Sequence, residues 1–191
     1  MRLAADQKKG RVAQSSLVFV DESGFLLQPL VRRTWAPRGQ TPIHYSWDRH
    51  DRLSVIAALT LSPEQRRIGL YFQVLDRNVR APQAMSFLRE VHRQLRRDLI
   101  VIWDRSSVHR SAAKQLLSAD HPWLEVEWLP PYAPDLNPVE AVWSHTKYSD
   151  LANFLPDDKQ HLEDQVVESL RQQYHDQPLK RSFFQAAELK L

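Results

Sequence analysis

One stretch of five apolar residues, Leu99-Ile100-Val101-Ile102-Trp103, ends abruptly at the carboxylate of Asp104. An unbroken apolar run of this length is typical of a strand that is buried on both faces, as in the middle of a parallel or mixed sheet. We therefore expect Asp104 at the carboxyl end of a buried strand, where open α/β sheets place their ligands. The same pattern occurs earlier, where Leu17-Val18-Phe19-Val20 runs into Asp21.

The other periodic segments complete the prediction of an α/β fold. Alternating and continuous apolar patterns predict strands at residues 53–61, 68–74 and 124–129. Helical spacing of apolar residues predicts a helix over residues 84–95, and shorter helices follow at residues 111–117 and from Val139 onward. Two more helical patterns lie in the tail, at residues 162–170 and 183–189. This order of strands and helices is typical of a domain with a mixed sheet.

Composition excludes several classes of site. The chain has 191 residues and 42% hydrophobic residues, enough for one domain with a sizeable core. It has no cysteine, which rules out disulfides, thiolate zinc sites and cysteine nucleophiles, and only four glycines, too few to favour Gly-rich phosphate loops. No apolar run approaches the roughly 20 residues that span a bilayer, and residues 1–12 lack the apolar region of a signal peptide. We expect a cytoplasmic protein without membrane contact.

The net charge is only +3, but the charges are unevenly distributed. Residues 31–52 hold five arginines against two aspartates, and residues 89–97 hold a second basic cluster, whereas residues 150–176 are acidic. This asymmetry suits a polyanion-binding surface on one side, although ordinary solvated faces remain the alternative. The arginines in the first cluster that we expect to contact phosphates are Arg32, Arg33 and Arg38.

A third carboxylate, Glu140, follows a proline-rich run at residues 129–138. Three convergent carboxylates would suit Mg²⁺, a hard cation that prefers oxygen ligands. Two such ions about 4 Å apart activate a nucleophile and stabilise a leaving oxygen at a phosphodiester. At 100° per residue, Glu140 and Lys147 share one edge of the buried face of their helix, so Lys147 is placed to meet a phosphate.

Each carboxylate also has a structural alternative. Aspartates at strand ends are common in turns and caps, and Asn137-Pro138-Val139-Glu140 fits an N-cap and capping box in which Glu140 reaches back to the cap. Glu22 is a substitute candidate for Asp21, but strand alternation would point it to the other side of the sheet. His109 is more typical of a core or surface histidine than of a ligand.

Several of these segments together are more specific. The runs at residues 18–25, 103–104 with 108–111, and 129–143 resemble the catalytic domain of DDE transposases of the Tc/mariner superfamily and its bacterial insertion-sequence relatives. The segment Trp35-Ala36-Pro37-Arg38-Gly39-Gln40-Thr41-Pro42 is similar as well. The 35 residues between Asp104 and Glu140 are close to the spacing of the second and third acids in that family.

The resemblance implies a ribonuclease-H-like fold, with a five-stranded mixed sheet and helices on both faces. It places the catalytic domain at residues 16–150, a linker or extension at 1–15, and a helical segment packed on the same domain at 151–191. By similarity, Asp21, Asp104 and Glu140 are the catalytic acids that bind two Mg²⁺ ions, with Mn²⁺ as a substitute. The residues that we expect to contact DNA are Arg32, Arg33, Arg38, His109 and Lys147.

The implied activity is cleavage at transposon ends followed by joining to target DNA, carried out by a homodimer. The family's N-terminal helix-turn-helix region has no counterpart in the fifteen or so residues before the first strand, so we expect the catalytic half alone. Three explanations stay open: a second reading frame joined by frameshifting, a truncated remnant, or a partnership with a separately encoded helix-turn-helix subunit. Arg105 also departs from the asparagine that is frequent in relatives. Two alternatives stay open: a non-catalytic truncated transposase that regulates or partners a full-length enzyme, and a cellular nuclease acting on RNA–DNA hybrids.

Overall fold

The computed structural model describes residues 14–43, 45, 51–64, 66–119 and 121–189. They form a mixed five-stranded sheet with the strand order β3-β2-β1-β4-β5. The strands are β1 (Ser16–Leu26), β2 (Arg52–Leu61), β3 (Ile68–Leu75), β4 (Leu99–Trp103) and β5 (Leu124–Trp128). β1, β2 and β3 form an antiparallel meander, whereas β4 pairs parallel with both β1 and β5. The predicted ribonuclease-H-like sheet is therefore confirmed.

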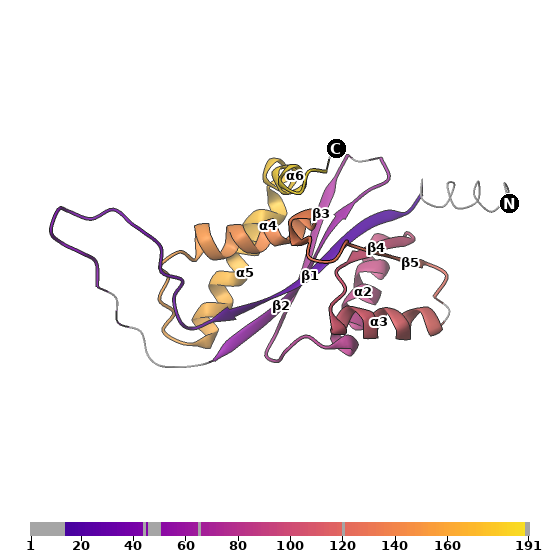
Figure 1. The fold of residues 1–191 in the computed structure, drawn as a ribbon, viewed down its shortest axis with the longest axis horizontal. Coiled ribbons are helices and arrows are strands. Elements are labelled where there is room, and N and C mark those ends of the chain that lie inside the picture. The colour runs from indigo at the N-terminus through magenta and orange to yellow at the C-terminus, as the bar shows by residue number, and fades with distance from the viewer. Residues whose placement is uncertain (1–13, 44, 46–50, 65, 120, 190–191) are drawn as a thin grey trace.

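Helices cover both faces of the sheet (Figure 1). One face packs against α2 and α3, and the other against α4, α5 and α6. The helices are α2 (Ala81–Leu95), α3 (Ser107–Ser118), α4 (Pro138–His145), α5 (Lys159–His175) and α6 (Gln177–Ala186). A π-helical turn, Thr146–Asp150, extends α4. The tail helices α5 and α6 share one hydrophobic core with β1, β2 and β3.

Strand alternation in β1 divides the interior into two cores. Phe19 and Phe25 point to the face covered by α4, α5 and α6, whereas Val18 and Val20 point to the face covered by α2 and α3. Successive side chains of β1 therefore pack against different sets of helices, because side chains alternate between the two faces of a strand. This alternation decides where the neighbouring carboxylates of β1 point.

Two predicted boundaries were wrong. The first strand was predicted to stop at Val20, but β1 continues to Leu26 because β2 pairs with it along this whole length, from Asp21 opposite Ala57 onward. The helix predicted from residue 111 begins at Ser107, because the Ser106 side chain accepts a hydrogen bond from the His109 amide and caps the first turn.

The segment after β1 extends away from the sheet (Figure 1) and exposes large apolar side chains. They are Val31 (85% exposed), Trp35 (100%), Ile43 (72%) and Tyr45 (88%). The base of this segment is fixed to the chain that follows α4. Leu30 forms a bridge with Ala152, and the Asn153 side chain accepts a 2.7 Å hydrogen bond from the Arg32 amide.

Some predictions concern residues outside the described ranges. The proposed linker lies outside the described residues except for residues 14–15, and so does Arg49 of the first basic cluster. Within the part of the chain that the structure describes, no helix is both long and apolar enough to cross a bilayer.

Candidate active site

Three predicted carboxylates line one cavity of about 430 Å³. Asp21 comes from β1, Asp104 follows β4, and Glu140 lies in the first turn of α4. The cavity is closed on one side by the proline-rich segment 129–134. The sheet topology explains the convergence, because β1 and β4 are parallel neighbours and the start of α4 is tied to β1.

Asp21 is held by the helix that carries Glu140. The Trp143 indole Nε1 donates a 2.9 Å hydrogen bond to Asp21 Oδ2. Burial raises the pKa of the Asp21 carboxyl to about 7, and the nearby charges of Glu140 and Glu22 act in the same direction. A carboxyl that resists ionisation next to other carboxylates indicates a site that favours a cation.

Asp104 lies at the carboxyl end of β4, as predicted. Its side chain is 53% exposed and faces the cavity entrance. Asp104 Oδ1 accepts a 3.0 Å hydrogen bond from the Ser106 amide and contacts His109 Nδ1. The start of α3 therefore fixes one oxygen of Asp104, while the other oxygen has no hydrogen bond to the described residues.

His109 is buried between two carboxylates, and its expected contact with DNA stays a prediction. Its side chain is 1% exposed, and its Nε2 lies 2.9 and 2.8 Å from the two oxygens of Glu22. The ring stacks on Trp103, with centroids 4.6 Å apart and planes 8° from parallel. Burial lowers the pKa of His109, but the Glu22 hydrogen bond and the charges of Glu22 and Asp104 outweigh it and raise the pKa above its ordinary value.

The two carboxylates of β1 point to opposite faces, as predicted from strand alternation. Asp21 meets Trp143 of α4, and Glu22 meets His109 of α3. Glu22 is therefore not a replacement for Asp21 in the cavity, whose lining includes Asp21 but not Glu22. It supports the histidine that contacts Asp104.

Glu140 is free to face the cavity, because the capping-box alternative fails. The Asn137 amide donates to Pro134 O at 2.8 Å, so it has no need of the Glu140 side chain. Burial raises the pKa of Glu140, although the positive charge of Lys147 opposes this shift and Asp104 adds to it. Lys147 is half-buried, feels the charges of Glu140 and Asp21, and lies 5.2 Å from the centroid of the Phe25 ring.

Asn137 and Trp143 are two residues whose role at the site the sequence did not predict. Asn137 caps α4 by accepting from the Val139 amide at 3.2 Å, and its Nδ2 also donates to Val20 O at 3.2 Å. The same side chain thus starts α4 and docks it on β1 beside Asp21. The cap at Asn137 and the buried face of the helix were predictable from the sequence, but these partners in β1 were not.

The predicted arginines lie apart from the cavity. Arg32, Arg33 and Arg38 are exposed in the extended segment after β1, and they do not line the cavity of the three acids. The Arg32 guanidinium lies 4.7 Å from the centroid of the Tyr148 ring, just beyond Lys147. The turn after α4 therefore links this basic segment to the helix of Glu140.

The donor set fits a hard divalent cation. Three carboxylates and few cations line the cavity, and such oxygen ligands are those that Mg²⁺ prefers. Among the described residues, no three acidic or histidine side chains are already grouped closely enough to hold a metal ion.

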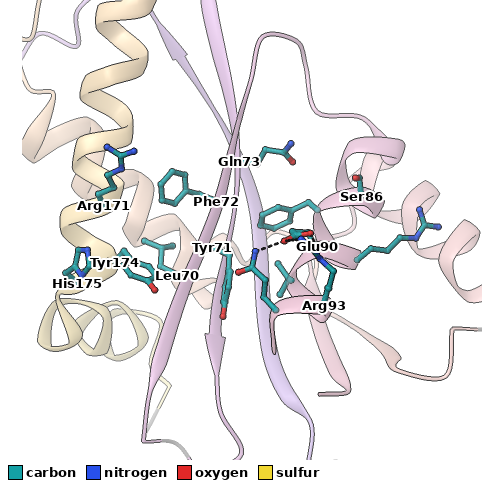
Figure 2. A pocket seen from close by; sticks show the side chains of 14 residues that line it. Leu70, Tyr71, Phe72, Gln73, Ser86, Glu90, Arg93, Arg171, Tyr174 and His175 are labelled. Carbon is teal, nitrogen blue, oxygen red and sulfur yellow. Dashed lines mark hydrogen bonds and ion pairs between the residues drawn. The ribbon is translucent and has the colours of Figure 1, made fainter. Parts of the chain in front are cut away.

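A larger cavity, of about 910 Å³, lies elsewhere along the edge strand β3, between α2 and α5 (Figure 2). None of the three predicted acids lines it, and its only carboxylate, Glu90, is already paired with Arg93 at 2.8 Å. The size of a cavity is therefore a poorer guide here than the chemistry of its lining.

Comparison with known proteins agrees with the fold. Residues 16–163 match the family described as DDE superfamily endonuclease. No curated protein matches the sequence. Among solved structures, the chain is similar to "Mos1 transposase paired-end complex with left transposon end", with 16% identity, a TM-score of 0.61, and coverage of 97% of this chain and 55% of that one.

Two further Mos1 structures give the same result. "Crystal structure of the mariner Mos1 paired end complex with Mg" has 16% identity, a TM-score of 0.62, and coverage of 97% and 57%. "Crystal structure of the Mos1 Strand Transfer Complex" has 18% identity, a TM-score of 0.60, and coverage of 97% and 54%. The chain thus spans little more than half of these solved chains. It shares their fold and, by the family match over most of its length, belongs to the DDE superfamily endonucleases.

Proposed function

We propose that this chain is the catalytic domain of a transposase, which cleaves phosphodiester bonds at transposon DNA ends and joins them to target DNA by a two-metal DDE mechanism. The observation that carries the proposal is the convergence of Asp21, Asp104 and Glu140, from three separate elements, on one cavity in a DDE superfamily endonuclease. The Mos1 structures support it, because they include complexes with a transposon end and with Mg or Mn.

In this proposal Asp21, Asp104 and Glu140 hold two Mg²⁺ ions, with Mn²⁺ as a substitute. Bound ions would supply charge stabilisation at the phosphodiester and an activated oxygen nucleophile. Trp143 holds the Asp21 carboxylate in place through its 2.9 Å hydrogen bond, and Asn137 fixes the start of α4 on β1. Lys147, beside Glu140, supplies a positive charge for a DNA phosphate.

His109 acts in the same proposal as a positioning residue. The Nδ1 atom of His109 contacts Asp104, and the Nε2 atom of His109 contacts Glu22, which fixes the ring. This arrangement resembles the carboxylate–histidine pairs that orient ligands in metal sites, although here the histidine orients a carboxylate. The buried ring thus contributes to the site through Asp104.

The segment after β1 supports a role in DNA contact and in assembly. Its exposed Arg33 and Arg38 suit phosphates, and its exposed Trp35 and Val31 suit a protein surface, since apolar side chains exposed together mark contact sites. We expect a homodimer that uses this segment. A separately encoded helix-turn-helix subunit that recognises the transposon ends also stays a prediction.

The proposal is tested by nicking of supercoiled plasmid in Mg²⁺ and in Mn²⁺. We expect the wild-type chain to nick and Asp104→Asn to be inactive, while Asp164→Asn, which removes an exposed carboxylate of α5, retains activity. Equal nicking by wild type and Asp104→Asn would refute the assignment. Folded protein that never nicks, but binds a full-length transposase stably, would favour the regulatory alternative.

A further inference from the structure

A second polar cavity, of about 390 Å³, lies at the end of the sheet opposite the three acids. It is lined by Ser16 at the start of β1, which pairs with Leu99 at the start of β4, whereas Asp104 follows the other end of β4. The remaining polar and glycine lining is Thr60, Ser62, Arg67, Gly69, Tyr71, Arg97, Tyr174, Gln177 and Lys180. The two cavities share no lining residue, so what binds in one can be tested apart from the other.

The charge of this cavity is entirely positive. Lys180, Arg67 and Arg97 line it, and no aspartate or glutamate does. Arg97 is partly neutralised by Glu64, whose Oε1 lies 3.4 Å away, but both side chains of that pair are about half exposed, which weakens the attraction. Such a concentration of positive charge in a concave site attracts an anion.

Lys180 is the decisive residue, because its whole side chain is 1% exposed. Its ammonium donates to the carbonyl oxygen of Tyr174 and, within the described part of the chain, pairs with no carboxylate. Asp176 favours the charged form from a distance, but its Oδ1 caps α6 by accepting from the Leu179 amide at 2.8 Å. Burial and the charge of Arg67 lower the pKa of Lys180. A buried ammonium without a counter-ion is costly, and an anion would remove that cost.

Hydroxyl groups complete the lining. Ser16 and Thr60 are 2% and 3% exposed, and both line the cavity. Gly69 preserves the space around them, because a Cβ there would lie 2.5 Å from Thr60 Oγ1 and 3.0 Å from the Tyr71 ring. Tyr174 extends from α5 toward β3, where Tyr71 lies, so two further hydroxyl-bearing side chains flank this edge of the sheet (Figure 2).

We propose that this cavity binds a phosphate group, either free phosphate or the terminal phosphate of a nucleotide or of a DNA end. A phosphate has several strong acceptor oxygens and therefore matches an ammonium, two guanidinium groups and hydroxyls at once. A terminal phosphate can enter a concave site, whereas a phosphodiester within an intact duplex is bonded to a sugar on each side and cannot. The proposal is independent of the transposase assignment.

The test is a titration of the full chain with inorganic phosphate. Binding is measured by calorimetry and stabilisation by thermal unfolding, and sodium chloride at equal ionic strength is the control. We expect phosphate, but not chloride, to bind and to stabilise the wild type. Lys180→Met keeps the length of the buried stem and removes the charge, so phosphate affinity should fall about tenfold or more. Lys114→Met, which makes the same change at an exposed position of α3, is the matched control and should bind normally.

Two further measurements keep the test decisive. Arg67→Gln changes an exposed residue and should also weaken phosphate binding, which covers the case in which Lys180→Met does not fold. Asp104→Asn should bind phosphate as the wild type does, because it alters the other cavity. Stabilisation by phosphate that is equal in wild type and Lys180→Met, or that chloride reproduces, would overturn the proposal.

The source of the phosphate is distinguished by competition. Inorganic phosphate is displaced with a nucleoside monophosphate, and with an oligonucleotide carrying either a 5′-phosphate or a 5′-hydroxyl. Preference for the phosphorylated over the hydroxyl oligonucleotide assigns the cavity to DNA ends. Displacement by the nucleotide alone assigns it to a small ligand. Displacement by both oligonucleotides equally would contradict entry of a terminal phosphate and overturn the proposal.

Discussion

His109 Nε2 lies 2.8 Å from Glu22 Oε2, although the two residues are 87 positions apart in the sequence. The opposite nitrogen of the same ring contacts Asp104. A buried histidine therefore connects the second carboxylate of β1 to the carboxylate at the end of β4, behind the candidate metal site. This relationship gives Glu22 and His109 a function that neither residue type suggests alone.

The Glu22–His109 pair should be energetically coupled. His109→Phe keeps a ring to stack on Trp103 but removes both nitrogens, which leaves Glu22, 21% exposed, without its partner. In a double-mutant cycle with Glu22→Gln, we expect a coupling energy of about 1–3 kcal/mol in the free energy of unfolding. Urea unfolding measures it, and the control cycle of His109→Phe with Asp135→Asn should be additive. Additivity in the first cycle would mean that the contact contributes nothing to stability.

Asp21 should make the metal-free protein less stable as the pH rises. Its pKa is raised from 3.8 to about 7, so between these values the folded chain keeps a proton that the unfolded chain has lost. The unfolded state then binds fewer protons, and stability falls with pH until about 7. Asp21→Asn abolishes this dependence and should stabilise the metal-free protein at pH 8 by on the order of 2 kcal/mol, below the roughly 4 kcal/mol of the full shift because the carboxylate stays partly hydrated.

Unfolding in EDTA at pH 5 and pH 8 measures this effect. The gain from Asp21→Asn should be small at pH 5 and large at pH 8. Asp164→Asn, at an exposed position of α5, provides the matched control and should show no such difference. An Asp21→Asn variant that is equally destabilised at both pH values would contradict the raised pKa.

Trp143 should influence metal affinity through Asp21. Trp143→Phe removes the indole donor, which now lowers the pKa of Asp21, and leaves a small void beside Phe25, 6.2 Å away between ring centroids. We expect a loss of about 1–3 kcal/mol in stability and weaker Mn²⁺ binding, because Asp21 then holds its proton more firmly. Trp123→Phe, on the face of α2 and α3, controls for the loss of an indole elsewhere. Unchanged Mn²⁺ affinity in Trp143→Phe would exclude this role.

The arginines after β1 should carry the salt dependence of DNA binding. Changing Arg32, Arg33 and Arg38 to alanine should reduce the slope of log affinity against log salt by about 2–3, if each contacts one phosphate. Part of the effect of Arg32 is structural, since its guanidinium also lies on Tyr148. Fluorescence anisotropy with duplex DNA measures the slope. An equal slope in the triple variant and the wild type would refute the prediction. The combined change of the exposed Arg77, Lys114 and Arg171 to alanine serves as the charge-matched control.

The sequence predicted those features that depend on neighbouring residues. The apolar run before Asp104 defined β4, and Asn137-Pro138 defined the start of α4, because burial and capping act over a few residues. The extension of β1 past Asp21 was not predictable, since Glu22-Ser23-Gly24 interrupts the apolar pattern and only pairing with β2 keeps the chain extended. Long-range pairing overrides local preference in strands.

The position of the carboxylates could be predicted better than the residues that hold them. Asp21, Asp104 and Glu140 were expected at one site, and they line one cavity. The residues that hold the carboxylates were not predictable, because their contacts join distant parts of the chain. Trp143 is 122 residues from Asp21, and His109 is 87 residues from Glu22. A histidine is compatible with a core, a surface or a ligand position, so its residue type alone does not decide between them.

The most direct test of the central assignment is the binding of Mn²⁺ to the wild-type chain and its variants. Electron paramagnetic resonance measures the free Mn²⁺ that remains at each protein concentration. Unlike DNA cleavage, metal binding does not depend on recognition of a DNA end. We predict that Asp104→Asn and Glu140→Gln each weaken Mn²⁺ binding about tenfold or more, and that Asp164→Asn, at an exposed position of α5, binds as the wild type does. Equal Mn²⁺ affinity in the wild type and Asp104→Asn would contradict a metal site built from Asp21, Asp104 and Glu140.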